Sequence, residues 1–222
     1  MLKKVLVALL SISLTLVVVG CSNSNKNEIQ ENPQKVETKK EETFIGDGTW
    51  TKDYTREEVI AFNEEISPRI EEEANFYGME YNKEEIVKEE KGETVNDNSI
   101  YFDNLNPEPN KIESMYYGMK IYGSDLSKGS LNLKIGLKLD IDQIKEEDKF
   151  DLKETTISNF SEAMTNDIER DYTEINEKII EIVKNQNSNG KIESNLDGLV
   201  ETITINEDYI LYKLDSKVYK FK

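Results

Sequence analysis

Two segments that alternate apolar and polar residues constrain the fold of this 222-residue chain more than any other feature. They span residues 112–122 and 131–141, with the polar stretch Gly123–Ser130 between them. The apolar positions are Met115, Tyr117, Met119 and Ile121 in the first segment and Leu131, Leu133, Ile135, Leu137 and Leu139 in the second. A period of two is typical of a strand that buries one face. We therefore predict an antiparallel hairpin.

Helical signals lie on both sides of this hairpin. Thr55 and Glu58 have the spacing of a capping box, and apolar residues follow at helical intervals as far as Ile70. Pro68 predicts either a kink or a restart of the helix at Ser67. Gly78 is a plausible end.

A second, longer helix is predicted from Thr156 to Gln186. Its apolar face comprises Phe160, Met164, Ile168, Tyr172, Ile175, Ile179 and Ile182. The polar run Asn185–Gly190 ends it.

The C-terminus predicts a meander of three strands, and a weaker pattern precedes the hairpin. The three strands are Leu199–Asn206, Tyr209–Leu214 and Lys217–Phe221. Ile86–Val87 and Ser99–Phe102 are consistent with short strands, and residues 106–110 with a loop. The order helix, strands, helix, strands predicts a single α+β domain over residues 44–222. We expect its helices to pack on one face of an antiparallel sheet.

The N-terminus has the pattern of a secretion signal. Lys3 and Lys4 precede fifteen uncharged residues, Val5–Val19, a run too short to span a bilayer comfortably. The next residues complete Val18-Val19-Gly20-Cys21, which resembles the lipobox of bacterial lipoproteins. Val18 departs from the usual leucine. The resemblance implies that residues 1–20 are a signal peptide cleaved after Gly20, and that Cys21 receives a diacylglyceryl group.

A two-chain anchor at Cys21 predicts stable attachment to the outer face of the cell membrane. Residues 21–43 contain almost nothing apolar, and such a composition predicts a disordered tether. As a coil, this tether reaches about 25 Å. The richness in Lys, Glu, Asn and Ile resembles the proteomes of low-GC Gram-positive bacteria.

Composition excludes several chemistries. The chain contains no histidine, and Cys21 is its only cysteine, so Ser-His-Asp catalysis, His- or Cys-ligated zinc and disulfides are all excluded. Loss of Lys3 and Lys4 changes the net charge from −17 to −19, which disfavours nucleic acid and favours cationic ligands or basic envelope proteins. Asp140-Ile141-Asp142 begins like a calcium loop but lacks the residues that must follow. We expect no metal and no cofactor.

Paired glutamates in the first predicted helix form one candidate surface. They recur every seven residues and are Glu57, Glu58, Glu64, Glu65, Glu71 and Glu72. Seven residues are nearly two helical turns, so the pairs form a stripe. The stripe is either a surface for a cation or basic partner, or a solvated face that keeps the protein soluble. Pro68 interrupts its regularity.

A second candidate lies on the polar face of the predicted hairpin. Gly118 and Gly136 fall on that face, with Tyr116 and Tyr122 nearby. Glycine within a strand marks a bulge or a close approach. These four residues either form the floor of a shallow ligand groove or provide a seat for a packed element.

Two functional hypotheses follow. The first is a non-enzymatic lipoprotein that binds a ligand or partner in the cell envelope, because the sequence contains no recognisable set of catalytic residues. The alternative is a carboxylate-based hydrolase of cell-wall glycan, which requires two acids facing each other across a cleft.

Substitution of Cys21 tests the anchor. Labelling of cells with radioactive palmitate should mark the wild-type protein and leave Cys21→Ala unmarked, because the thiol is the acceptor of the diacylglyceryl group. A wild-type protein that remains unlabelled and soluble contradicts the lipobox assignment.

Overall fold

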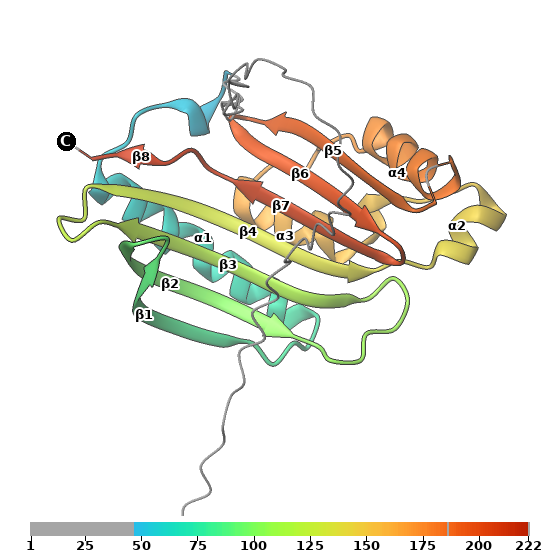
Figure 1. Ribbon diagram of the computed structural model, residues 1–222, viewed down its shortest axis with the longest axis horizontal. Coiled ribbons are helices and arrows are strands. Elements are labelled where there is room, and N and C mark those ends of the chain that lie inside the picture. Colours follow the sequence, from blue (N-terminus) through green and yellow to red (C-terminus); the bar gives the residue numbers. More distant parts are fainter. Residues whose placement is uncertain (1–46, 186, 222) are drawn as a thin grey trace, which may run out of the picture. The chain divides into compact units, whose positions relative to one another are not determined.

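The structure, a computed structural model, describes residues 47–185 and 187–221. The predicted signal peptide, Cys21 and the tether lie outside these residues. The described part contains helices and an eight-stranded antiparallel sheet, so the predicted α+β class is confirmed. The strand order is β1-β2-β3-β4-β7-β6-β5, with β8 paired to β4 (Figure 1).

The element bounds locate each feature in the sequence. The helices are α1 (Arg56–Phe76), α2 (Ile141–Glu147), α3 (Thr156–Thr165) and α4 (Thr173–Asn185), with short 3-10 turns at Thr49–Thr51 and Leu152–Glu154. The strands are β1 (Asn82–Glu90), β2 (Glu93–Asp103), β3 (Ile112–Tyr122), β4 (Lys128–Lys138), β5 (Asn189–Leu196), β6 (Leu199–Asn206), β7 (Tyr209–Asp215) and β8 (Tyr219–Lys220).

The predicted hairpin is confirmed as β3 and β4, but its second strand is shifted: β4 starts at Lys128, within the predicted turn, and ends at Lys138, before helix α2 begins at Ile141. Its apolar residues are buried and belong to the core, and the polar residues between them point to the other side of the sheet. The register pairs Tyr117 with Leu133 and Met119 with Leu131. Alternation alone was enough to identify these strands because both bury one face along their whole length.

Strands β1 and β2 are much longer than the short strands predicted for this region. They form a hairpin around Lys91 and Gly92, whose φ angles of 52° and 80° suit a tight two-residue turn. Most of β1 is exposed, and it carries no regular apolar alternation. The strand therefore gives no periodic signal in the sequence.

Helix α1 begins as the sequence predicts. The Thr55 hydroxyl accepts a hydrogen bond from the Glu58 amide at 3.3 Å, and the Glu58 carboxylate accepts one from the Thr55 amide at 2.7 Å. The helix continues through Pro68, so no restart occurs at Ser67. It ends just before Gly78, which adopts a positive φ of 66°.

The prediction of one long helix over 156–186 is wrong. Helix α3 ends at Thr165, where Asn166 takes a left-handed conformation that terminates the helix. Helix α4 begins at Thr173, whose amide donates to the Asp171 carboxylate at 2.9 Å. Ile168, which was assigned to the buried face, is 68% exposed in the intervening loop.

A buried ion pair lies in the same interruption. Arg170 donates to the Glu201 carboxylate of β6 at 2.7 Å, and its guanidinium lies 4.6 Å from the centre of the Tyr172 ring. Glu201 is fully buried and also accepts a hydrogen bond from Ser194. Burial by itself raises the pKa of Glu201, but the hydrogen bond from Arg170 holds that pKa below its ordinary value. A continuous helix would not bring Arg170 to this carboxylate.

The prediction of a C-terminal meander is correct for β6 and β7 but wrong for the last strand. Strand β8 has only two residues, and it pairs with the start of β4 instead of with β7. Strand β5, which the sequence did not predict, pairs with β6 and forms the edge of the sheet. Ile192 is its only buried apolar residue, and this accounts for its weak signal.

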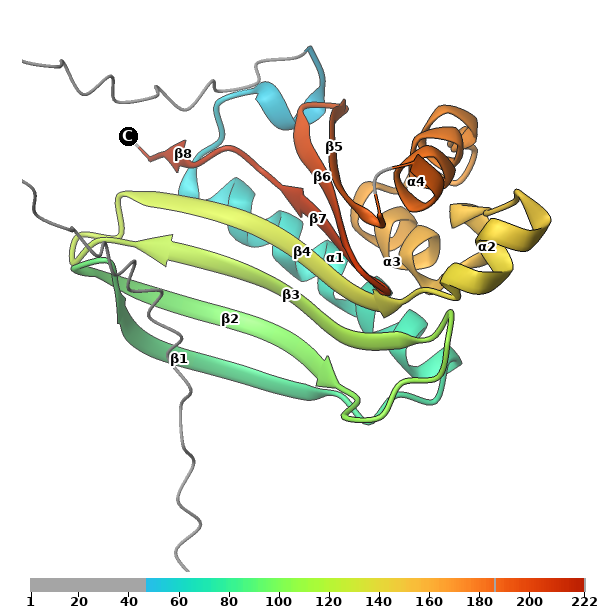
Figure 2. The same ribbon diagram turned by 45° about the vertical axis from the view of Figure 1, so that its right-hand side comes forward.

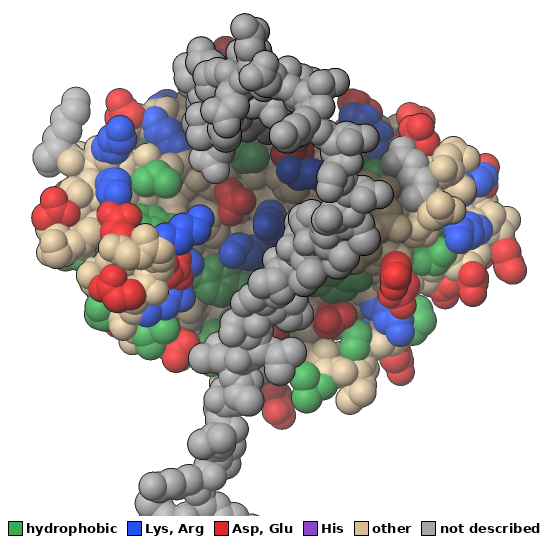
Figure 3. Space-filling view, in the orientation of Figure 1, with side chains coloured by type: hydrophobic (Ala, Val, Ile, Leu, Met, Phe, Trp, Pro, Cys, Tyr) green, Lys and Arg blue, Asp and Glu red, His purple; other side chains and the backbone are tan. Residues whose placement is uncertain are grey.

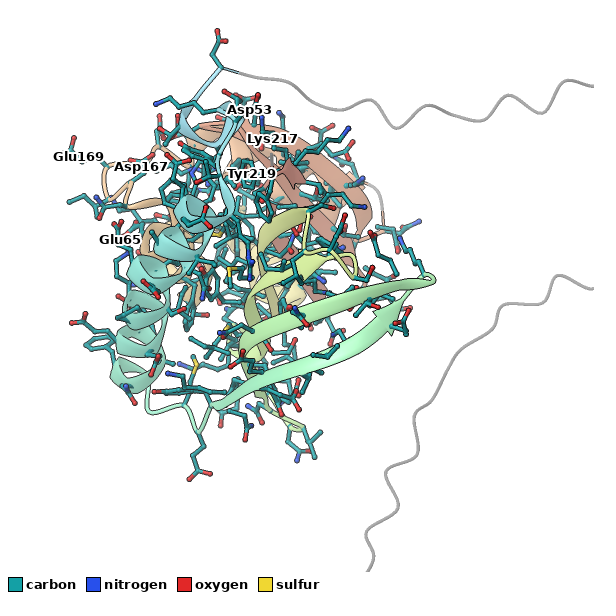
Figure 4. All side chains as sticks on the ribbon, turned by 90° about the vertical axis from the view of Figure 1, so that its left-hand side faces the viewer. Asp53, Glu65, Asp167, Glu169, Lys217 and Tyr219 are labelled. Carbon is teal, nitrogen blue, oxygen red and sulfur yellow. The ribbon has the colours of Figure 1, made fainter. Side chains whose placement is uncertain are left out.

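The first described residues are held against the C-terminal strands. The Lys217 ammonium donates to the Thr51 carbonyl at 2.6 Å and to the Asp53 carboxylate at 2.8 Å (Figure 4). The Tyr219 hydroxyl donates to the Trp50 carbonyl at 3.1 Å. These bonds tie residues 50–53 to the C-terminal end of the described chain.

The helices contact the sheet at different strands. Helix α1 packs on β3 and β4, α3 on α1 and β4, and α4 on β5 and β6 (Figures 1 and 2). The apolar residues of these elements form one core. Among the described helices, none is long and apolar enough to cross a membrane.

Arg170→Leu tests the buried ion pair. The variant should lose about 3–5 kcal/mol of unfolding free energy, because the Glu201 carboxylate stays buried without its partner. Replacing both residues in R170L/E201L should recover part of this loss. Urea denaturation followed by circular dichroism measures both, with Lys178→Ala as a surface control. A loss below about 1 kcal/mol for R170L contradicts a stabilising role for the pair.

Candidate functional site

The candidate site lies on the side of the sheet to which the polar residues of the β3–β4 hairpin point. We call this side the outer face. The strand registers assign to it Tyr116, Gly118, Lys120 and Tyr122 of β3, and they continue it across the sheet through cross-strand partners. Its central strands are β3, β4 and β7.

Lysines dominate the centre of this face, although the whole chain is strongly acidic. The register of β3 shifts between Ile112 and Ser114, so the outer face of this strand is counted from Ser114 onward. From there, the charged outer residues of β3, β4 and β7 are five lysines and one acid, Asp215. The lysines, here called the lysine strip, are Lys120, Lys128, Lys134, Lys138 and Lys213. Figure 3 shows several Lys and Arg side chains in the visible middle part of this face, and others nearer its edges. The chain has 45 acids and 28 basic residues, so the strip reverses the overall balance of charge.

Asp97 of β2 fixes one edge of the strip. It is only 2% exposed and accepts hydrogen bonds from the Lys88 ammonium at 2.6 Å and the Tyr116 hydroxyl at 2.8 Å. Lys120 pairs with Glu90 at 2.8 Å. That hydrogen bond and a second from Lys88 lower the pKa of Glu90. The charges at this edge are therefore neutralised within the domain.

Lys134 and Lys213 differ from the other members of the strip. They are direct cross-strand partners on β4 and β7, and both are half-buried. Within residues 47–185 and 187–221, neither ammonium has an ion pair or a hydrogen bond. Burial, then Lys120 and then Lys213 lower the pKa of Lys134, although Asp215 opposes the shift. Like charges placed directly opposite each other also destabilise a sheet.

Tyrosine rings lie across the glycines of the outer face. The space above Gly118 is occupied by the ring of Tyr116, and the space above Gly136 by the ring of Tyr209. The Lys134 ammonium lies 5.3 Å from the centre of the Tyr116 ring. The four groove candidates predicted from the sequence, which include Tyr122, thus share one face of the sheet. The two glycines among them, however, each accommodate the ring of a neighbouring tyrosine. Tyr122 lies further along β3, where its hydroxyl is 3.1 Å from the Ser130 hydroxyl.

The six glutamates of the predicted stripe all lie on α1, and half of them are engaged inside the domain. Glu58 belongs to the capping box, Glu65 pairs with Arg69 at 2.9 Å, and Glu71 pairs with Lys83 at 2.7 Å. Glu57, Glu64 and Glu72 are exposed. Figure 4 places Glu65 on the same side of the domain as Asp167 and Glu169 of the α3–α4 loop.

A hollow of about 530 Å³ lies away from the lysine strip, around the loop between β2 and β3. Its walls combine the apolar side chains of Met79, Phe102 and Ile112 with the polar side chains of Asn104 and Thr156. Its volume is within the range of small-molecule sites. Two exposed carboxylates, Glu108 and Glu154, also line it. Among the described residues, no cluster of three His, Cys, Asp or Glu side chains could hold a metal ion.

Sequence reasoning missed Asp97, Lys134 and Lys213 as site residues. The polar alternation of β4 already placed Lys134 on the outer face, and a count of charges by strand face could have identified it. Nothing in the sequence placed Lys213 beside it, because that neighbourhood requires β4 to pair with β7. Asp97 is in a part of β2 that was not predicted as a strand.

Comparisons with known proteins add no further evidence about this site. No family model matches the chain, and neither a curated protein nor a solved structure matches it. The site is therefore interpreted from its own geometry and charge.

The titration of Lys134 tests the electrostatics of the strip. After reductive methylation with labelled formaldehyde, NMR should show Lys134 titrating below Lys83 and Lys88, whose pKa values are raised. Lys213→Met should raise the pKa of Lys134 by removing a like charge, and Asp215→Asn should lower it further. Native stability should correspondingly rise with pH between the lowered pKa and the ordinary value of 10.5. A pKa of Lys134 that is insensitive to both substitutions contradicts this account.

Proposed function

We propose that this protein is a non-enzymatic lipoprotein of the cell envelope, anchored through Cys21 on the extracytoplasmic face of the membrane, and that it binds a partner on its outer sheet face. In this proposal the helices occupy one face of the sheet, in the order helix, strands, helix, strands. The opposite face is then left as a broad surface for contact.

The observation that carries the proposal is the reversal of charge on β3, β4 and β7. A solvated face with no partner has no need to place Lys134 opposite Lys213, where burial and the neighbouring lysines disfavour the charge of Lys134. An acidic group bound between them relieves this repulsion. The arrangement therefore supports a binding surface better than it supports a passive one.

The acid stripe of α1 supports a partner surface less strongly. Glu58, Glu65 and Glu71 already have partners within the domain. The exposed Glu57, Glu64 and Glu72 serve solubility in this proposal, as charge runs on a helix surface usually do. A cationic ligand at this stripe stays a prediction, and so does the absence of nucleic-acid binding.

The hydrolase alternative also stays a prediction. The hollow beside the β2–β3 loop is the place where it can be tested, because Glu108 and Glu154 line the same space. Loss of glycan turnover in both E108Q and E154Q is the result that this alternative requires.

Site-specific crosslinking in cells tests the proposed contact surface. Benzoylphenylalanine in place of Thr202, a half-buried outer residue of β6, should form adducts with envelope material. The matched control is the same substitution at Glu64, which is exposed on α1 and should form none. Both variants are made in the full-length protein and checked for export. Adducts from Glu64 alone, or from neither position, contradict the proposed surface.

A further inference from the structure

We infer that the lysine strip binds a linear anionic glycan, with one of its carboxylate or phosphate groups seated between Lys134 and Lys213. This inference rests on the proposed function and names the class of ligand for the same face. The lysines, the neighbouring tyrosine ring, the size of the strip and the acids around it each bear on the class of ligand.

The central lysine pair provides the seat for the anion. Lys134 and Lys213 are the two strip members without a carboxylate within 4 Å in the described part of the chain, whereas Lys120 and Lys128 pair with Glu90 and Glu93. Lys138 approaches Asp208 at 3.9 Å. Lysine binds phosphate and carboxylate groups as a point charge. An anion is therefore favoured most at the centre of the strip.

Tyr116 adds a fixed apolar surface beside this seat. Its hydroxyl is held by Asp97 at 2.8 Å, and its ring lies across Gly118 along the strand. A side chain at position 118 would displace the ring, so the glycine allows the ring to rest on the sheet. An aromatic ring with a tethered polar end presents apolar area at little further entropic cost. A sugar ring next to the bound anion can pack on it.

The dimensions of the strip favour a chain over a globular partner. Strand spacing and rise make the three strands together about 14 Å wide, with a length of about 35 Å for β3 and β4 and about 23 Å for β7, so their area is below about 500 Å². A stable globular interface buries about 800 Å² on each partner. A globular protein would therefore extend beyond the strip onto its neighbours, whereas a single polymer chain fits along β4.

The surroundings of the strip limit the charge density of the ligand. The outer positions of β1, β2 and β5 carry two lysines, Lys88 and Lys191, and six acids: Glu84, Glu90, Glu93, Asp97, Asp103 and Glu193. Four of these acids pair with lysines, but acids still outnumber lysines on these strands. A single nucleic-acid strand carries a charge about every 3.4 Å and would bring many phosphates into these acidic surroundings. A glycan with charges on only some of its sugars avoids this repulsion.

Direct binding measurements test the inference. Full-length protein in detergent is titrated with hyaluronate, a linear glycan with carboxylates on alternate sugars, and separately with a phosphorylated mannan. We expect at least one of them to bind, neutral dextran not to bind, and single-stranded DNA and polyglutamate to bind more weakly. The two charged glycans distinguish a carboxylate ligand from a phosphate ligand.

Lysine variants locate the site. K134M should weaken binding about tenfold and K134M/K213M further, because each removes a charge-assisted contact but keeps an apolar stem. K134R/K213R should retain binding, and K178M on exposed α4 is the matched control. Thermal unfolding confirms that each variant is folded.

Three results overturn the inference: neither charged glycan binds, binding is unchanged in K134M/K213M, or polyglutamate or DNA binds more tightly than both glycans. The proposed function is judged separately. If crosslinked adducts still form at Thr202 while one of these results is obtained, the outer face is a contact surface and the glycan assignment alone fails. If the adducts are also missing, both fail.

Discussion

The pairing of β4 with both β3 and β7 is the interaction on which the rest of the structure depends. It joins the N-terminal strands to the C-terminal strands in one sheet. The inner side chains Leu133, Ile135 and Leu137 of β4 are fully buried, and both α1 and α3 pack on this strand. Without the β4–β7 ladder, each half would expose a strand edge with unpaired backbone N–H and C=O groups. The same ladder brings Lys134 beside Lys213 on the outer face.

Much of the fold could be predicted because helices and strands that bury one face carry apolar residues at regular intervals in the sequence. The β3–β4 hairpin buries one face throughout, and the start of α1 is marked by Thr55 and Glu58. Strands β1 and β5 could not be predicted in the same way, since edge strands are largely exposed and their residues alternate only weakly. Their pairing follows from the neighbouring strand and from tight turns such as Lys91–Gly92.

The broken helix shows where periodicity misleads. Ile168 and Tyr172 have the spacing of a helix face, yet a left-handed Asn166 ends α3 before either is reached. Helical spacing cannot reveal that Arg170 has a buried partner in a strand far along the chain. Burying Glu201 on the inner side of β6 requires a cation there, and the loop between α3 and α4 provides it. Tertiary charge pairing thus overrides a local pattern.

The outer face contains two kinds of lysine environment, which differ in whether acids of the domain neutralise the lysines. Where Asp97 and Glu90 accompany Lys88 and Lys120, the charges are satisfied and Tyr116 is held in place. Where β4 meets β7, Asp215 is the only acid within these two strands, and it already accepts a hydrogen bond from Asn132 at 2.7 Å. An interior must neutralise its charges, as it does at Glu201, but a surface can leave the neutralising group to a ligand. The contrast between these two lysine pairs is therefore the strongest physical reason for proposing a binding site at Lys134 and Lys213.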